Sequence, residues 1–463
     1  MPEKLRFYNT LSRKKEVFKS LKDKEVRMYT CGPTVYWYQH IGNLRSYVFP
    51  DILKRILKIN GYKVKHVINV TDVGHLTSDA DTGEDKIEKA AKQEGKTAKE
   101  ISEHYLKVFL QDLKKMNIYE PDFWPKATEN IKEQIEIIKK LEKKGFTYKT
   151  SDGIYFDTSK LKDYGKLAKL NIKGLEAGKR VSFGEKRNKT DFALWKFSEE
   201  PGKRQQEWAS PWGVGFPGWH IECSAMSMKY LGETFDIHTG GEDHISVHHT
   251  NEIAQSEAST GKPFVKYWLH GAFLMFKGEK VSKSKGGLYT LLELEELGYK
   301  PMHLRYFYLL GHYRKPLDFT LENLDAAKNA YEKLKNILSE FKKSREKKNK
   351  KNIDAAYRQF LEIVNDDLNM PKALSYLWDI LREDRLNQAE KYELALRFDG
   401  IFGLDLGKEE KINIPGDVKK LVAEREKHRL KKDFKTADKI REKINKLGFV
   451  VEDKEKGFVV KKR

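Results

Sequence analysis

The sequence predicts an α/β fold: a Rossmann-like parallel sheet with an insertion, followed by an all-α helical bundle and a small C-terminal α+β domain. Two separate stretches of the chain alternate short apolar runs, typical of buried parallel strands, with helical patterns. Between them this alternation is lost, and beyond residue 290 the pattern is almost wholly helical. A chain of 463 residues is also too long for a single core.

We therefore predict six segments. They are the first half of the Rossmann domain (1–117), a connective insertion (118–205), the second half of the Rossmann domain (206–275), a loop region (276–320), a helical bundle (321–408) and a small C-terminal domain (409–463).

The first half begins with a strand, a loop and a helix. The predicted elements are an extended segment over 6–16, strands over 26–30 and 62–70, helices over 43–57 and about 97–115, and a polar approach over 79–89. A strand–loop–helix unit presents backbone N–H groups and the positive end of a helix at the carboxyl edge of a sheet. This edge is where phosphates and nucleotides bind.

The insertion and the second half follow. The insertion has a helix over 131–144, short strands at 147–148 and 153–156, and a segment rich in glycine and charge over 163–189. In the second half we expect a helix that ends near 231, a strand over 235–238 and a helix over 247–259.

The last part of the chain is predicted to be helical and basic. An amphipathic stripe runs from Leu321 to Phe341, and the lysine-rich run over 342–352 is either a solvated linker or a contact to a nucleic-acid backbone. After the bundle we expect two helices, 418–431 and 434–447, and a hairpin of 449–452 with 457–460.

The composition favours a polyanionic partner. Lys and Arg number 89 against 69 Asp and Glu, a net charge of +20, which points to nucleic acid, although a lysine-rich proteome is an alternative reading. A hydrophobic content of 39% excludes general disorder. No signal-peptide core or membrane-length apolar run is present in the sequence, so we expect a cytoplasmic protein without a membrane partner.

The two cysteines raise the question of a metal. His248 and Glu252 stand at i and i+4 on one helix face and, with Cys31 and Cys223, could form a tetrahedral zinc site. The alternative is that both cysteines are small buried hydrophobes. Other histidines of the region could equally be ligands: His220, His238, His244 and His249.

Two further motifs suit ATP chemistry. His-Ile-Gly-Asn at 40–43 opens the first helix, and Lys-Val-Ser-Lys-Ser occupies 280–284 in a flexible loop. His40 and Asn43 can donate hydrogen bonds to phosphate oxygens, and lysines can neutralise a leaving pyrophosphate. By itself, the first motif could be a helix-capping turn.

Together these motifs resemble the two class I aminoacyl-tRNA synthetase signatures, usually written HIGH and KMSKS. The flanking stretches are similar to the cysteinyl-tRNA synthetases almost from end to end, at 29–36, 69–72, 191–196, 217–226, 235–238, 248–256, 304–307 and 433–447. Asn43 replaces the second histidine and Val281 the methionine. Neither change is expected to abolish activation, because asparagine still offers donors and Val281 is a packing position.

The resemblance implies a cysteine–tRNA ligase. It would activate L-cysteine with ATP, accompanied by Mg²⁺, to cysteinyl-adenylate and transfer cysteine to the terminal adenosine of tRNA(Cys). It implies one Zn²⁺ per chain, held by Cys31, Cys223, His248 and Glu252, which selects the substrate thiolate. The other implied contacts are His40, Asn43, Lys280 and Lys283 for catalysis, His40, Gly42, Asn43, Gly240, Gly241, Asp243 and Lys283 for ATP, and Gly32, Thr71 and Trp219 for cysteine.

The resemblance also implies a monomer, a stem-contact role for 276–320 and an anticodon-binding role after residue 321. Two alternatives remain: an ATP-dependent cysteine:amino-sugar ligase, and a catalytically inactive tRNA-binding paralogue. A small-molecule ligase has little use for a helical bundle and a basic terminal domain, and the signature residues that matter most are present. Whether the substrate thiolate expands the zinc coordination or displaces a ligand is left open.

Overall fold

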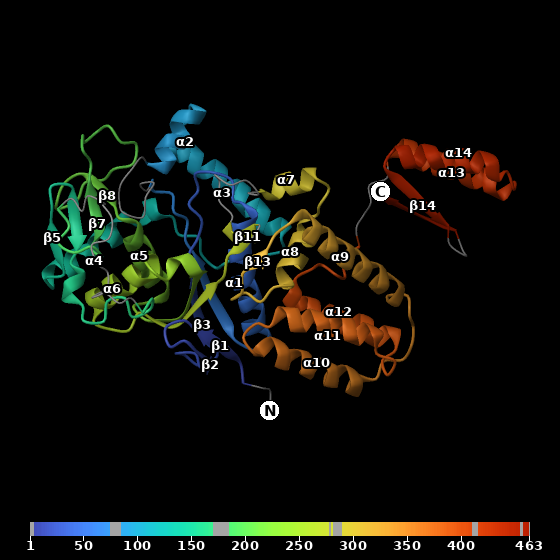
Figure 1. The fold of residues 1–463 in the computed structure, drawn as a ribbon, viewed down its shortest axis with the longest axis horizontal. Coiled ribbons are helices and arrows are strands. Elements are labelled where there is room, and N and C mark those ends of the chain that lie inside the picture. Colours follow the sequence, from blue (N-terminus) through green and yellow to red (C-terminus); the bar gives the residue numbers. More distant parts are fainter. Residues whose placement is uncertain are drawn as a thin grey trace. The chain divides into compact units, whose positions relative to one another are not determined.

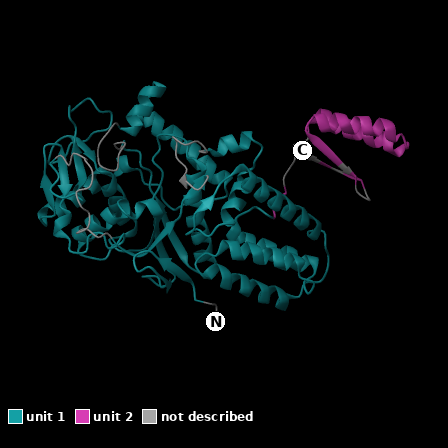
Figure 2. Ribbon diagram, viewed as in Figure 1, with its two compact units in different colours: residues 1–406 teal, residues 407–463 magenta. Residues whose placement is uncertain are grey.

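The structure is a computed structural model that describes residues 4–74, 85–169, 185–276, 279–280, 289–409, 415–453 and 457–462. It divides into two compact units, Met1–Leu406 and Gly407–Arg463 (Figure 2).

A parallel sheet lies at the centre of the first unit. Its strands are β3 (Glu25–Thr30), β4 (Lys63–Ile68), β9 (Phe235–Gly241) and β10 (Val265–Gly271), in the order β10-β9-β3-β4. All three pairings are parallel, and β3 pairs with β9 from the far side of the insertion. The predicted fold class is confirmed, with β10 as an additional strand that was not among the predicted elements.

Helix α1 (Ile41–Ile59) connects β3 to β4 and packs against both the sheet and the bundle helix α12 (Figure 1). Its apolar stripe is buried in the main core through Leu44, Val48, Ile52 and Ile56. Because the strands on either side are parallel, the helix must return along the sheet, which brings its N-terminus to the carboxyl ends of the strands.

Two predictions for the first half are wrong in part. The extended segment over 6–16 is a hairpin of β1 (Arg6–Asn9) and β2 (Lys14–Val17), paired antiparallel. The polar approach over 79–89 gives way to a helix, α2 (Lys86–Glu94), which precedes α3 (Ala98–Lys115). Asp85 caps α2, and its apolar residues are buried against α3, so tertiary packing outweighs the polar composition. Residues 75–84 lie outside the described residues.

The insertion contains an antiparallel sheet of four strands. They are β5 (Thr147–Lys149), β6 (Gly153–Phe156), β7 (Phe192–Phe197) and β8 (Gly215–Pro217), in that order. Strand β8 lies beyond residue 205, so this sheet continues past the predicted segment boundary. The helical parts are η1 (Ala127–Asn130), α4 (Ile131–Lys143) and η2 (Thr158–Lys160).

The chain then returns to the parallel sheet. This part consists of α5 (Trp219–Leu231), η4 (Glu242–His244) and α6 (His248–Thr260). Three short strands follow, β11 (Leu274–Phe276), β12 (Glu279–Lys280) and β13 (Leu317–Asp318), with α7 (Leu291–Glu296) and α8 (Pro301–Leu309) between them.

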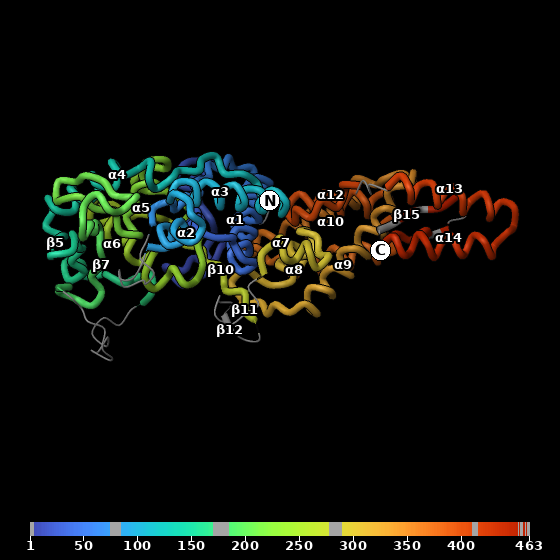
Figure 3. Tube along the Cα trace, turned by 90° about the horizontal axis from the view of Figure 1, so that it is seen from above, coloured from blue at the N-terminus to red at the C-terminus, as the bar shows by residue number. Residues whose placement is uncertain are grey.

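Four helices form the predicted bundle (Figures 1 and 3). They are α9 (Leu321–Phe341), α10 (Lys350–Asn365), α11 (Met370–Arg382) and α12 (Gln388–Phe402). The lysine-rich run lies between α9 and the start of α10, and its Lys348 pairs with Glu393 of α12 at 3.0 Å. Part of this run is therefore held within the bundle.

The second unit is small and contains α13 (Gly416–Leu430), α14 (Phe434–Lys446), β14 (Phe449–Asp453) and β15 (Phe458–Lys462). Its core is built from Val418, Val422, Ile440, Ile444 and Phe449. Across the described parts of both units, none of the helices combines the length and the apolar character that crossing a membrane requires.

Candidate active site and metal centre

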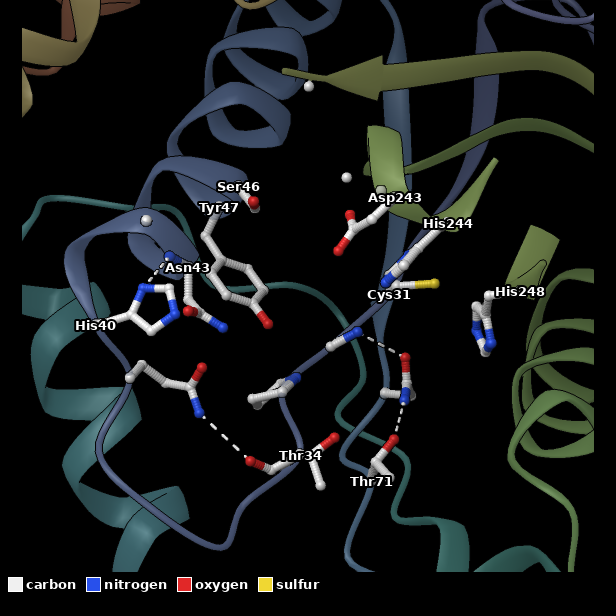
Figure 4. Close-up of a pocket in the computed structure, with 18 of the residues that line it drawn as sticks. Cys31, Thr34, His40, Asn43, Ser46, Tyr47, Thr71, Asp243, His244 and His248 are labelled. Carbon is white, nitrogen blue, oxygen red and sulfur yellow. Dashed lines mark hydrogen bonds between the residues drawn. The ribbon is translucent and has the colours of Figure 1, made fainter. Parts of the chain in front are cut away.

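A cavity of about 410 Å³ opens at the carboxyl ends of the parallel strands (Figure 4). Its walls include Gly32 after β3, Asn69 after β4, Gly240 in β9 and Gly271 in β10, together with the N-terminal turn of α1. Crevices at this edge of an α/β sheet bind nucleotides because helix N-termini and loop N–H groups converge there. The predicted residues His40, Gly42, Asn43, Gly241, Asp243, Thr71 and Trp219 also line the cavity.

His40 is the N-cap residue of α1, and its Nδ1 accepts a hydrogen bond from the backbone N–H of Asn43 at 3.2 Å. Because Nδ1 acts as an acceptor, the proton of the neutral imidazole lies on Nε2, which is a donor. The capping role and the role at the cavity are therefore compatible: one nitrogen holds the helix, and the other can donate.

Four donor atoms that suit a metal lie together beside this cavity. The sulfurs of Cys31 and Cys223, a nitrogen of His248 and an oxygen of Glu252 all lie within 4.8 Å of one another. Ligands of a tetrahedral zinc ion, each about 2.0–2.3 Å from the metal, lie roughly 3.3–3.8 Å apart. Two sulfurs, one imidazole and one carboxylate are a zinc-type donor set, so the residues present fit this ion.

The fold explains how such distant residues meet. Cys31 follows β3, and Cys223 lies in the second turn of α5, where it is buried. His248 and Glu252 lie on one face of α6, with His248 Nε2 3.0 Å from Glu252 Oε1. Helices α5 and α6 pack against each other beside β3, and this packing brings the three elements to one point.

The groups of this cluster shift one another's pKa values. The hydrogen bond with Cys31 lowers the pKa of Cys223 to about 7, although burial opposes this shift. Burial would lower the pKa of His248, but Glu252 and Cys223 raise it to about 10. The Glu252 carboxyl group, despite its burial, has a pKa held well below its usual value by His238 and His248. A metal cation would replace the protons that these groups share.

A second donor set overlaps the first. Cys31 and Glu252 also lie within 4.8 Å of His238 and His249. His249 Nε2 is 3.2 Å from Cys31 Sγ, and His238 Nε2 is 2.9 Å from Glu252 Oε2. The two sets therefore share two donors, Cys31 and Glu252.

Two further histidines, His220 and His244, lie next to the metal donors. His220 Nδ1 lies 2.9 Å from His248 Nδ1, and His244 lines the cavity. The Trp219 ring packs against His248 in a tilted arrangement, with 4.3 Å between the ring centroids. Trp219 therefore forms a wall where the metal donors meet the cavity.

Gly240 leaves room for two of these rings. A Cβ atom at this position would lie 2.6 Å from Cε1 of His249 and 2.9 Å from Nδ1 of His244. Any side chain here would displace a histidine, which explains why glycine stands at this point of β9.

Of the two signature lysines, only one is described, and only in part. The backbone of Lys280 belongs to β12 and pairs with Met275 of β11. Lys283 lies outside the described residues. The lysine contacts with ATP therefore stay predictions.

Several residues that line the cavity had no role in the sequence analysis. Ser46 and Tyr47 of α1 face it (Figure 4). Asn69 also lines it and forms hydrogen bonds to Gly32 and Thr71. Ser46 could have been found from its spacing, since it stands three residues after Asn43 on a helix. The bonds of Asn69 depend on two loops that are distant in sequence.

Two family models match this chain. The model for the class I (C) tRNA synthetase catalytic domain covers residues 17–329, and the cysteinyl-tRNA ligase anticodon-binding domain covers residues 413–460.

Curated relatives match over nearly the whole length. Cysteine–tRNA ligase 1 of Burkholderia lata is 49% identical over 457 residues, covering 98% of this chain and 96% of the relative. The cysteine–tRNA ligase of Thermococcus gammatolerans is 43% identical over 485 residues, and that of Treponema denticola is 42% identical over 480 residues. The Thermococcus match covers 99% of both chains, and the Treponema match covers 97% of this chain and 98% of the relative.

Solved structures match the fold alone. The methionyl-tRNA synthetase of Mycobacterium tuberculosis in complex with methionyl-adenylate has a TM-score of 0.56 at 14% identity, and the match covers 82% of this chain and 90% of that one. By its catalytic and anticodon-binding domain models and its full-length relatives, the chain belongs to the cysteinyl-tRNA ligases, a family of class I tRNA synthetases.

Proposed function

We propose that this ligase activates L-cysteine with ATP to cysteinyl-adenylate, releasing pyrophosphate, and then transfers cysteine to the 3′-terminal adenosine of tRNA(Cys). The observation that carries the proposal is that one cavity is lined both by the N-terminus of α1 and by three of the four metal donors, Cys31, Cys223 and His248, with the fourth donor, Glu252, within 4.8 Å of them. A thiol-selective site thus lies beside a phosphate-binding edge.

In the first step, a carboxylate oxygen of cysteine attacks the α-phosphorus of ATP, and the bond to pyrophosphate breaks. No protein nucleophile is needed, so the residues contribute position and positive charge. His40 donates from Nε2 and Asn43 from its amide, and the positive end of α1 stabilises the negative charge that develops on the phosphate. Asp243, Gly240 and Gly241 form the nucleotide side of the cavity in this proposal, with Mg²⁺ accompanying the ATP.

In the second step, the 2′-hydroxyl of the terminal adenosine attacks the carbonyl carbon of the adenylate, and AMP leaves. The tRNA specificity of this proposal rests on the C-terminal region, whose residues 413–460 match an anticodon-binding model. A small-molecule ligase would have no use for this domain.

Zinc, when bound by Cys31, Cys223, His248 and Glu252, would hold the substrate sulfur as a thiolate. Serine and cysteine differ by a single atom, and shape alone separates such substrates by only about 10²-fold. A soft sulfur donor gives the larger discrimination. Trp219 then closes the side of the cavity next to His248 and limits the size of the amino acid.

The proposal is tested by cysteine-dependent exchange of pyrophosphate into ATP, repeated with serine, and then by charging of purified tRNA(Cys). We expect exchange with cysteine, exchange with serine near background, and charging. Exchange without charging would favour the cysteine:amino-sugar ligase. A complete lack of exchange would refute the enzymatic reading of the site.

A further inference from the structure

The side chain of Asn69 connects two loops that line the cavity, one at Gly32 and the other at Thr71. Its Oδ1 accepts a hydrogen bond from the backbone N–H of Gly32 at 2.8 Å, and its Nδ2 donates one to Thr71 Oγ1 at 3.0 Å (Figure 4). Asn69 is only 1% exposed and Thr71 only 2%. The two bonds therefore form a buried link between the loop after β3 and the loop after β4.

The orientation of the Asn69 amide follows from the chemistry of its partners. A backbone N–H can only donate, so the amide atom that faces Gly32 must be the oxygen, and the NH₂ group must face Thr71. Thr71 Oγ1 then accepts through a lone pair, and its own hydrogen points elsewhere. Within the part of the chain that the structure describes, no hydrogen bond takes up the Thr71 hydroxyl hydrogen.

The backbones of the two loops are also fixed against each other. The N–H of Thr71 donates to the carbonyl of Pro33 at 3.0 Å, and the N–H of Val35 donates to the carbonyl of Thr71 at 3.2 Å. A Cβ atom on Gly32 would lie 1.6 Å from the backbone carbonyl oxygen of Asn69, so only glycine fits there. The backbone therefore holds Gly32 and Thr71 in place where they form hydrogen bonds with the Asn69 side chain.

We propose that Asn69 is a positioning residue for L-cysteine, which holds the Thr71 hydroxyl as a donor to the substrate carboxylate. This inference rests on the proposed function, in which cysteine binds in the cavity that Gly32 and Thr71 line beside Cys31. Because the Gly32 N–H is used by Asn69, Gly32 has only its carbonyl oxygen to offer, and this oxygen suits the substrate ammonium group. The two loops then recognise the two charged ends of the amino acid.

The test uses the zinc-loaded, full-length protein and its variants Thr71→Val, Asn69→Ala and Asn69→Asp. Pyrophosphate exchange gives KM for cysteine and for ATP, and inhibition by cysteamine gives the affinity for a ligand with the thiol and amine but no carboxylate. Loss of one hydrogen bond to a charged group changes affinity about tenfold. We expect Thr71→Val and Asn69→Ala each to raise KM for cysteine about tenfold and to leave KM for ATP and the cysteamine inhibition constant unchanged.

The isosteric variant gives a sharper result. In mildly alkaline buffer, the ionised carboxylate of Asn69→Asp can only accept, so it would take the Thr71 hydrogen away from the substrate. KM for cysteine is expected to rise at least as much as in Asn69→Ala. Asn130 is also 1% exposed but does not line the cavity, so Asn130→Asp is the matched control and should leave KM for cysteine unchanged.

The double variant Asn69→Ala with Thr71→Val decides whether Asn69 acts through Thr71. We expect no further rise in KM for cysteine beyond that of Thr71→Val alone. Additive effects, or a cysteamine inhibition constant that rises with KM for cysteine, would overturn the inference. An unchanged KM for cysteine in Thr71→Val alone would instead show that cysteine does not contact Thr71, and this would also overturn the inference.

Discussion

A buried charge cluster fixes α1 within the first unit and offers a quantitative test of the structure. The Asp51 carboxylate on α1 accepts hydrogen bonds from Arg55 Nε at 2.9 Å, from Arg305 Nη2 at 2.5 Å and from the backbone N–H of Tyr119 at 2.8 Å. The side chains of Asp51 and Arg305 are fully buried, and that of Arg55 is 3% exposed. One carboxylate therefore balances two guanidinium groups that have lost their water.

Asp51→Asn removes the carboxylate that both guanidinium groups share and keeps its shape. Breaking a buried ion pair from one side costs roughly 3–5 kcal/mol of unfolding free energy, because the remaining charge is uncompensated. Both arginines keep hydrogen bonds to backbone carbonyls, including those of Phe402 and Gly400, so we expect a loss near the lower limit, about 3 kcal/mol. Urea unfolding of the full-length protein measures this loss.

Asp366 provides the matched control. Its side chain is 49% exposed and pairs with the half-exposed Lys15 at 2.8 Å, so Asp366→Asn should cost less than about 1 kcal/mol. Equal losses in the two variants would refute the reasoning. Adding Arg305→Met to Asp51→Asn should recover part of the stability, since it removes an unpaired buried charge, and a fully additive loss would contradict this account.

Three further predictions concern the cavity and its surroundings. Cys223→Ser should lower the zinc content and raise KM for cysteine more than KM for ATP; unchanged metal stoichiometry would remove the zinc assignment. His40→Asn keeps a good N-cap for α1 but cannot place an Nε2 donor, so the thermal midpoint should be retained while the exchange rate falls about 10²-fold or more, and a near-normal rate would remove His40 from catalysis. Burial raises the pKa of Asp72 from 3.8 to about 6, despite hydrogen bonds from Thr128. The folded state therefore binds more protons than the unfolded state between these values, and the stability contributed by Asp72 falls as pH rises through about 4 to 6, by roughly 3 kcal/mol in total. Asp72→Asn should remove this part of the pH dependence, as urea unfolding at several pH values would reveal; an unchanged pH profile would contradict the shift.

The local pattern of the sequence was enough for most elements. The stripe from Leu321 to Phe341 predicted α9 with its observed bounds, and the alternation of apolar runs with helical patterns predicted the parallel sheet. These features depend on neighbours within a few residues, so the sequence reports them directly. The sequence did not predict α2, which is polar, or β10, whose apolar pattern is short. Helix α2 becomes stable only by packing against α3, and strand β10 only by pairing with β9.

The sequence also determined which chemical groups the site contains: two cysteines, a histidine-rich second half and two ATP-type motifs. It did not decide how they meet. His248 joins Cys31 and Cys223, while His238 and His249 form an overlapping set, because α5 and α6 pack beside β3 from the far side of an insertion. Distances between such elements depend on the packing of the whole unit rather than on local propensity. For the same reason only the tertiary structure identifies Asn69, whose two hydrogen bonds join loops from separate strands.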